Sequence, residues 1–137
     1  MKQFFFVLLF LSLLLVMGCG SNIKLSGKVV FSDDGSPVSS GTVCFVDGPF
    51  MARGDIRPDG TFDVGSLGVK GGLPPGTYNV YFVDTHKEVG HHEGVSITEP
   101  LIAPKYESPL TSELTFTVDG STRTVEFSLE RASERRR

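Results

Sequence analysis

The chain lacks tryptophan, has only two cysteines and carries no excess of positive charge. Of its 137 residues, 13 are Lys or Arg and 16 are Asp or Glu, so the formal net charge is −3 at pH 7. That slightly acidic balance gives the folded body no attraction for nucleic acid. No segment after residue 18 shows sustained helical periodicity, which argues against a helical fold.

Turn-forming residues are plentiful instead, with 16 glycines and 8 prolines. Glycine and proline at this density indicate short elements joined by many turns. The length favours one domain with a single core.

The most informative stretch is the N-terminus. After Lys2, an apolar run of 14 residues extends from Phe4 to Met17 and is interrupted only by Ser12. As a helix it is about 21 Å long, against about 30 Å of bilayer hydrocarbon. It is therefore too short for an ordinary membrane span and fits the apolar region of a signal peptide.

The sequence that ends this run, Leu15-Val16-Met17-Gly18-Cys19, resembles the lipobox of bacterial lipoproteins. The resemblance implies cleavage after Gly18, acylation of Cys19 with palmitate-like chains, and export to the cell envelope. The lipid would hold the protein at the outer membrane or at the outer face of the inner membrane. A secretory signal cut elsewhere and a buried helix are the alternatives. Several acyl chains on one cysteine anchor a protein stably, and Cys44 is then left as a buried free thiol without a disulfide partner.

From residue 24 the pattern alternates with a period of two, which indicates β-strands. Asp-Gly recurs at positions 34, 47 and 59, between apolar runs, and this dipeptide is the strongest short-range signal for a β-hairpin. A sandwich or barrel is expected, with Phe62 and Tyr78 in its core. The expected strands cover residues 24–31, 41–46, 50–56, 61–64, 77–84, a short segment near 95–102, 114–118 and 124–129.

The last two expected strands are separated by Asp119-Gly120 and are predicted to form a terminal hairpin. Val125, Phe127 and Leu129 are predicted to face the core. The predicted organisation is a signal peptide at 1–18, a lipidated cysteine and tether at 19–23, a sandwich at 24–130, and a basic disordered tail at 131–137.

Several motifs of the mature chain point to one known kind of domain. In chain order they are Gly27-Lys28-Val29-Val30-Phe31, Gly35-Ser36-Pro37-Val38, Gly41-Thr42-Val43-Cys44-Phe45, Asp59-Gly60-Thr61-Phe62, Leu73-Pro74-Pro75-Gly76-Thr77-Tyr78 and Ala103-Pro104-Lys105-Tyr106. Together they resemble the transthyretin-like (prealbumin-like), carboxypeptidase regulatory-like domains of bacterial envelope proteins. The resemblance implies an antiparallel β-sandwich of about seven or eight strands. The chain lacks the terminal Tyr-Arg-Gly-Ser motif of the hydroxyisourate hydrolases in that superfamily, so their activity is not expected here.

One cluster could hold a metal, because all three histidines lie within seven residues of a polar loop predicted at 84–93. Imidazole and carboxylate are ligands for zinc or copper. The alternative is a solvated loop without a metal, and the neighbours His91 and His92 would point opposite ways if this segment were a strand. The candidate ligands are His86, His91 and His92, assisted by Glu88 or Glu93.

Exposed aromatic rings could bind a carbohydrate, and Tyr81, Tyr106 and Phe50 are the candidates. Packing inside the domain or its turns is the favoured interpretation. No nucleophile has an identifiable base, so catalysis is not expected. The sequence therefore predicts a non-enzymatic, membrane-anchored envelope lipoprotein without a cofactor, which presents a binding or structural module to an envelope protein or glycan. The alternative is a solute-binding module for a metal ion or carbohydrate through 84–93.

Overall fold

A computed structural model describes residues 22–65 and 71–133 of the chain. The predicted signal peptide, Cys19 and the last four residues lie outside these ranges. Within them, no helix is long and apolar enough to cross a membrane.

The described chain is built almost entirely from nine β-strands, arranged in three sheets. One sheet has the order β4-β1-β9, the second β3-β2-β5-β8, and the third contains β6 and β7 alone. The elements are β1 (Leu25–Phe31), β2 (Thr42–Asp47), β3 (Phe50–Asp55), β4 (Thr61–Val64), β5 (Gly76–Val83), β6 (His86–His92), β7 (Val95–Pro100), a 3-10 helix (Pro104–Glu107), β8 (Leu114–Val118) and β9 (Thr124–Leu129).

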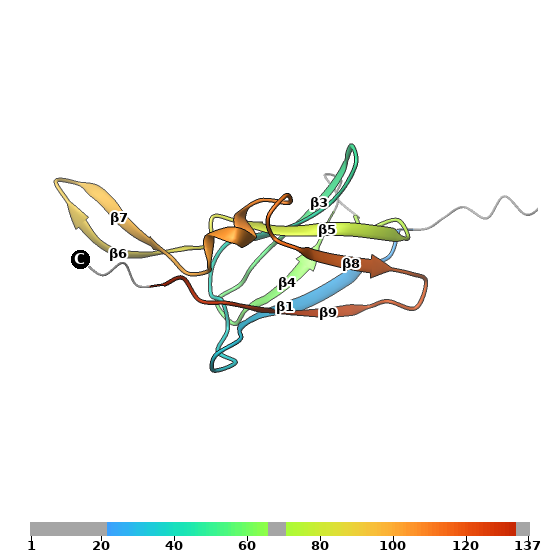
Figure 1. Cartoon of the computed structure of the whole chain (residues 1–137), viewed down its shortest axis with the longest axis horizontal. Helices are drawn as coiled ribbons and strands as arrows, with labels where there is room; N and C mark the ends of the chain where they lie inside the picture. The colour runs from blue at the N-terminus through green and yellow to red at the C-terminus, as the bar shows by residue number, and fades with distance from the viewer. Residues whose placement is uncertain (1–21, 66–70, 134–137) are drawn as a thin grey trace, which may run out of the picture.

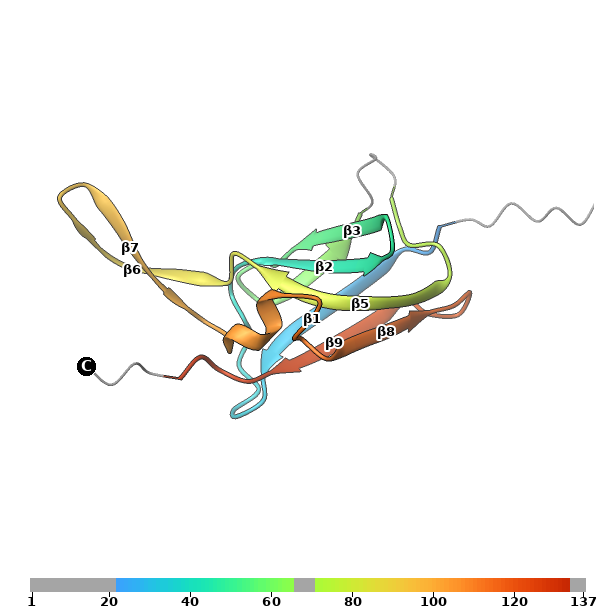
Figure 2. The same ribbon diagram turned by 45° about the horizontal axis from the view of Figure 1, so that its top comes forward.

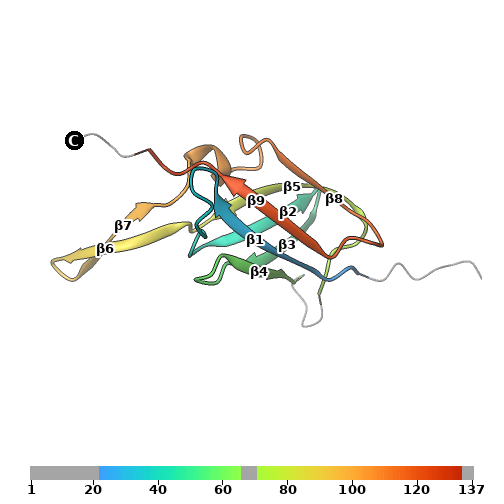
Figure 3. The same ribbon diagram turned by 90° about the horizontal axis from the view of Figure 1, so that it is seen from below.

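The first two sheets lie face to face and form a β-sandwich (Figure 1). Figure 3 shows the β4-β1-β9 layer in front of the four-stranded layer. The predicted all-β sandwich is confirmed, with seven strands in its two layers. One pairing departs from the expected antiparallel arrangement, because β1 runs parallel to β9 from Ser26↔Thr124 to Phe31↔Leu129.

Aromatic rings from both sheets fill the space between the layers. Phe45 of β2 lies 6.4 Å from Phe62 of β4 and 6.0 Å from Phe127 of β9, measured between ring centroids. Phe82 of β5 meets Phe127 edge-on at 5.8 Å. Such tilted and edge-on pairs contribute about 0.5–1.5 kcal/mol each beyond the burial of their area. The predicted core positions Phe62 and Tyr78 are confirmed as buried.

The predicted terminal hairpin is wrong. β8 pairs with β5 in the four-stranded sheet, whereas β9 pairs with β1 in the other sheet. The turn at Asp119 therefore carries the chain from one layer to the other. The predicted facing of β9 is confirmed, because Phe127 and Leu129 are buried, Val125 packs against the core, and Glu126 is exposed.

The Asp-Gly pairs also differ in what they connect. Asp47-Gly48 leads directly from β2 into its neighbour β3, as a hairpin should. Asp59-Gly60 instead lies at a corner where the chain passes from one sheet to the other. Asp34-Gly35 folds the chain back on β1, where Val38 N donates to the Val29 carbonyl at 3.0 Å, before the chain crosses to β2.

The ordered body extends beyond the predicted boundary at residue 130. The Arg131 guanidinium lies 3.7 Å from the centroid of the Phe31 ring and forms ion pairs with Asp33 at 3.0 Å and Asp34 at 3.3 Å. Ala132 N donates a hydrogen bond to the Leu101 carbonyl at 3.0 Å. The first residues of the predicted tail are thus held against the sandwich.

Candidate functional site

The third sheet, β6 and β7, projects from one end of the sandwich, and we call residues 86–100 the arm (Figure 2). Every residue of β6 is exposed except the half-buried Gly90, and every residue of β7 is exposed. An antiparallel sheet normally packs at least one of its two faces against the core. The arm buries neither face in the described structure.

The root of the arm is fixed to the sandwich at two neighbouring residues. Leu101 N donates to the Thr85 carbonyl at 2.8 Å, and the Thr85 side chain is fully buried. Among the described residues, its hydroxyl is the one buried side-chain polar atom without a hydrogen-bond partner. Asp84, just before it, has a positive φ of 55°. The arm therefore leaves the body through a tight, well-packed corner.

The tip of the arm is a two-residue turn, Glu93-Gly94, with φ values of 51° and 81°. Positive φ at both central residues is what a type I′ hairpin turn requires. The loop predicted at 84–93 is therefore wrong, since most of it is strand β6 and its end is this turn. Glu93 stands where Asn or Asp is usual, and for that reason the sequence signal was missed.

A β-bulge at Val89 fixes which residues share a face of the arm. The pairs Glu88↔Thr98 and Gly90↔Ile97 leave Val89 as the extra residue, so Val89 and Gly90 together oppose Ile97. We call one side the apolar face and the other the polar face. The apolar face carries Lys87, Val89, His92, Val95, Ile97 and Glu99, and the polar face carries His86, Glu88, His91, Ser96, Thr98 and Pro100.

The apolar face concentrates the exposed hydrophobic side chains. Val89 is 46% exposed, Val95 67% and Ile97 45%. Only one other large hydrophobic side chain among the described residues is exposed, Leu110 in the loop before β8. Isolated exposed apolar residues are ordinary, whereas a cluster on one surface marks a binding site.

The predicted metal ligands are only partly brought together. His91 Nε2 lies 3.2 Å from Glu88 Oε1 on the polar face, and His86 belongs to that same face. His92 lies on the opposite face, as the strand alternation predicts. Glu93 sits in the turn. Over the part of the chain that is described, no three His, Cys, Asp or Glu side chains gather closely enough to hold a metal.

The aromatic residues considered for carbohydrate binding mostly pack inside the domain. Tyr106 is buried in the core cluster, and its hydroxyl accepts a hydrogen bond from Glu130 N at 3.3 Å. Phe50 packs against the core, and Tyr81 is half-buried. The interpretation of these rings as packing residues is confirmed for Tyr106 and Phe50.

Cys44 is a buried free thiol on the side of β2 where Arg53 and Tyr81 are its cross-strand neighbours. Burial raises the pKa of this thiol, which keeps it protonated at neutral pH. A thiol in that form behaves as a small hydrophobe rather than as a nucleophile.

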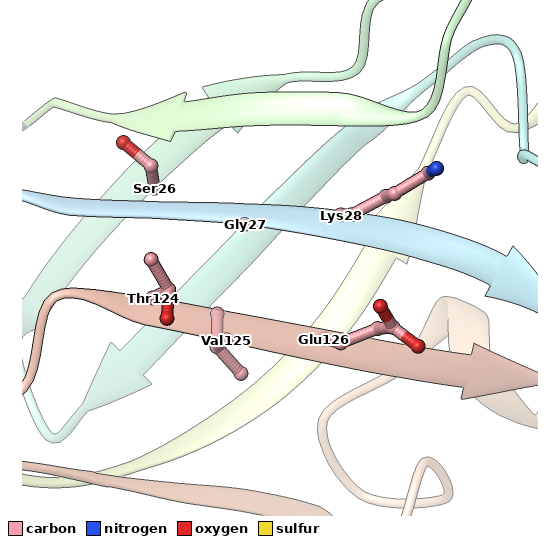
Figure 4. A pocket seen from close by; sticks show the side chains of 6 residues that line it. All are labelled: Ser26, Gly27, Lys28, Thr124, Val125 and Glu126. Carbon is pink, nitrogen blue, oxygen red and sulfur yellow. The ribbon is translucent and has the colours of Figure 1, made fainter.

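A shallow depression lies on the outer side of the β1–β9 pair (Figure 4). Its lining includes Gly27, and also Lys28 and Glu126, which are partners in the parallel register. The depression is open to solvent, and its two charged lining residues carry opposite charges. It offers less for recognition than the arm does.

Comparison with known proteins places the chain by its fold alone. No family model matches it, and no curated protein sequence matches it. Among solved structures, it is similar to the major pilin subunit BcpA of Bacillus cereus, with 11% identity and a TM-score of 0.50. That match covers 82% of this chain and 30% of the pilin subunit, so the chain spans under a third of that protein's length.

A second similar structure is a 9R-lipoxygenase from Cyanothece. Its identity is 15% and its TM-score 0.37, and the match covers 77% of this chain and 16% of the enzyme. A superposition this loose supports no argument about function. The likeness to the pilin subunit shows a β-sandwich fold.

Proposed function

We propose that this chain is an exported, lipid-anchored and non-enzymatic envelope protein whose sandwich holds the arm away from the membrane for a partner to bind. One observation carries the proposal. The described chain enters the sandwich at the end where β1 begins, and the arm leaves the opposite end (Figures 1 and 2). With a lipid on Cys19, the membrane lies at the first end and the arm at the far one.

The exposure of the arm supports a binding role. Three of the four exposed large hydrophobic side chains of the described residues lie on it: Val89, Val95 and Ile97. Burying such side chains in an interface gains roughly 25 cal/mol per Å2 of apolar area. The likeness to a pilin subunit supports a structural β-sandwich as the carrier of this surface.

The anchor is tested by feeding bacteria that express the full chain an alkyne-tagged palmitate analogue. We expect label on the wild-type protein and none on Cys19→Ser. Cys44→Ala is the matched control and should stay labelled, because Cys44 is buried in β2. Label retained by Cys19→Ser would contradict the anchor.

The display role is tested with a photo-crosslinking amino acid placed on the arm of the anchored chain. A crosslinker at Val95 should form a discrete adduct in cells, because this side chain is 67% exposed on the apolar face. The same crosslinker at Leu110, which is 92% exposed and lies outside the arm, is the control. Adducts of equal yield from both positions, or none from Val95, would contradict the role.

The alternative, a metal or carbohydrate site in 84–93, stays a prediction. The contact between Glu88 and His91 on the polar face is the observation that favours a metal. If zinc binds there, His91→Ala should weaken its uptake in calorimetry more than His92→Ala, because His92 lies on the other face. Equal effects of the two variants, or no heat above buffer, would end this alternative.

A further inference from the structure

The arm, taken alone, lacks the packing that a small β-structure needs. A two-stranded sheet is marginally stable in water unless a third strand or a hydrophobic surface packs against it. The arm nevertheless keeps a regular register, a bulge and a specific turn, with its apolar face uncovered. We propose that a second copy of this chain covers that face with its own apolar face. The proposal rests on the proposed function, since it names the partner of the displayed arm.

The symmetry of two identical arms determines which residues of one copy face which residues of the other. Consider two arms packed face to face about a two-fold axis that runs along their length. Rotation by 180° about that axis places β6 of one copy over β7 of the other. Residues that are cross-strand partners within one arm then become facing partners between the two arms.

The apolar face is complementary to itself under this rotation. Lys87 pairs with Glu99 inside one arm, so each Lys87 would face the partner's Glu99 and each Glu99 the partner's Lys87. Val89 would meet the partner's Ile97 at the centre. Two opposite-charge pairs at the root thus border four apolar side chains at the centre, and at the tip each His92 would face the partner's Val95.

The opposite orientation fits less well. With the two arms antiparallel, β6 would lie over β6, which places Lys87 near the partner's His92 and leaves Glu99 over the partner's Val95. It would also put the two lipid anchors at opposite ends of the pair. The axis along the arm keeps both sandwiches at one end, so both anchors reach the same membrane.

The arm is short, with strands of seven and six residues. Two such ribbons bury less area than a standard protein interface, so the association in dilute solution is expected to be weak. Tethering to one membrane raises the effective concentration of the two copies and strengthens the pairing.

The test uses the full chain. Two versions with different affinity tags are expressed together in one bacterial strain and crosslinked while both remain anchored to the membrane. Capture on one tag should recover the other tag. Ile97→Lys should lower this recovery roughly tenfold, because it places a desolvated charge at the centre of the pair. Leu110→Lys adds the same charge to an exposed apolar site outside the arm and should leave the recovery unchanged.

Charge reversal distinguishes pairing between copies from pairing within one arm. Lys87→Glu and Glu99→Lys each leave like charges facing each other and should lower recovery when expressed alone. Co-expression of the two variants should restore it, because every facing pair is then of opposite charge. Failure to restore it, recovery insensitive to Ile97→Lys, or a crosslinked product containing a different protein would overturn the proposal.

Failure here and failure of the proposed function are separable. A chain that is acylated on Cys19 and crosslinks through Val95 to another protein retains the display role but excludes self-association. A chain that is not acylated fails the proposed function, whatever its oligomeric state.

Discussion

The sandwich and the arm differ in how they bury their strands, although both consist mostly of antiparallel β-strands. In the sandwich, each strand hides one face, and aromatic rings from two layers meet at the centre. In the arm, strands of similar length leave both faces in water. The difference shows that regular strand pairing does not by itself indicate a core, because the arm keeps its pairing while both of its faces are exposed.

The largest effect is expected from the centre of the sandwich. Phe45→Ala removes a fully buried ring that neighbours Phe62, Phe127 and two further aromatic rings. We expect a loss of about 3–5 kcal/mol in the free energy of unfolding, measured by urea denaturation. Val95→Ala in the arm is the control and should change it by less than about 0.5 kcal/mol. Similar losses from both would erase the distinction between the two regions.

A smaller effect is expected from replacing a glycine in the sandwich, and a glycine in the arm provides the comparison. A Cβ on Gly27 would lie 2.4 Å from Phe62 Cζ and 2.6 Å from the Val125 carbonyl oxygen, so Gly27→Ala must displace the core. We expect it to cost about 1–3 kcal/mol of unfolding free energy. Gly90 in the arm has open space around it, and Gly90→Ala should be neutral or slightly stabilising. A neutral Gly27→Ala would show that β1 and β4 are less tightly packed than their contacts imply.

Acid should destabilise the sandwich in part by protonating its loop carboxylate Asp34. Hydrogen bonds from the Ser36 hydroxyl and backbone, with a smaller contribution from Arg131, lower the pKa of Asp34 from 3.8 to about 2. A lowered pKa stabilises the fold above the unfolded-state value of 3.8, and this contribution is lost as the pH falls through about 2. We therefore compare the temperature midpoint of unfolding at pH 4 and at pH 2. The decrease on going to pH 2 should be larger for wild type than for Asp34→Asn. Equal decreases in the two proteins would contradict a stabilising role of the ionised Asp34 side chain.

The smallest effect is expected from removing the arm. Replacing residues 86–100 with a short glycine linker keeps the junction where Leu101 N meets the Thr85 carbonyl. The unfolding free energy of the sandwich should change by no more than about 0.5 kcal/mol, since the arm covers none of the core. Calorimetry on the anchored protein in detergent would measure it. A large loss would mean that the arm supports the body rather than being displayed by it.

Much of the sandwich could be predicted from local pattern. Alternation in β5 and β9 identified Tyr78, Phe127 and Leu129 as core residues, because a strand with one buried face must place apolar side chains at every second position. Asp47-Gly48 gave a correct hairpin because its two strands pair directly.

The arm and its site were only partly predictable. The histidines drew attention to the segment that forms β6, and the separation of His91 from His92 onto opposite faces follows from strand geometry. The hairpin itself was missed, because Glu93-Gly94 lacks the usual Asn or Asp and the flanking residues are polar. The exposed side chains Val89, Val95 and Ile97 gave no signal, since a sequence does not show whether an apolar residue will be covered.

The sequence by itself determined that this chain forms β-strands, where most of them turn, and which side chains of each strand seek burial. These are properties of neighbouring residues and need no knowledge of distant ones. Only the tertiary structure decided that β8 and β9 belong to different layers, that β1 pairs in parallel with β9, and that β6 and β7 stand free. Those choices depend on which distant surfaces fill the same space, and each strand could have satisfied its own pattern in more than one sheet.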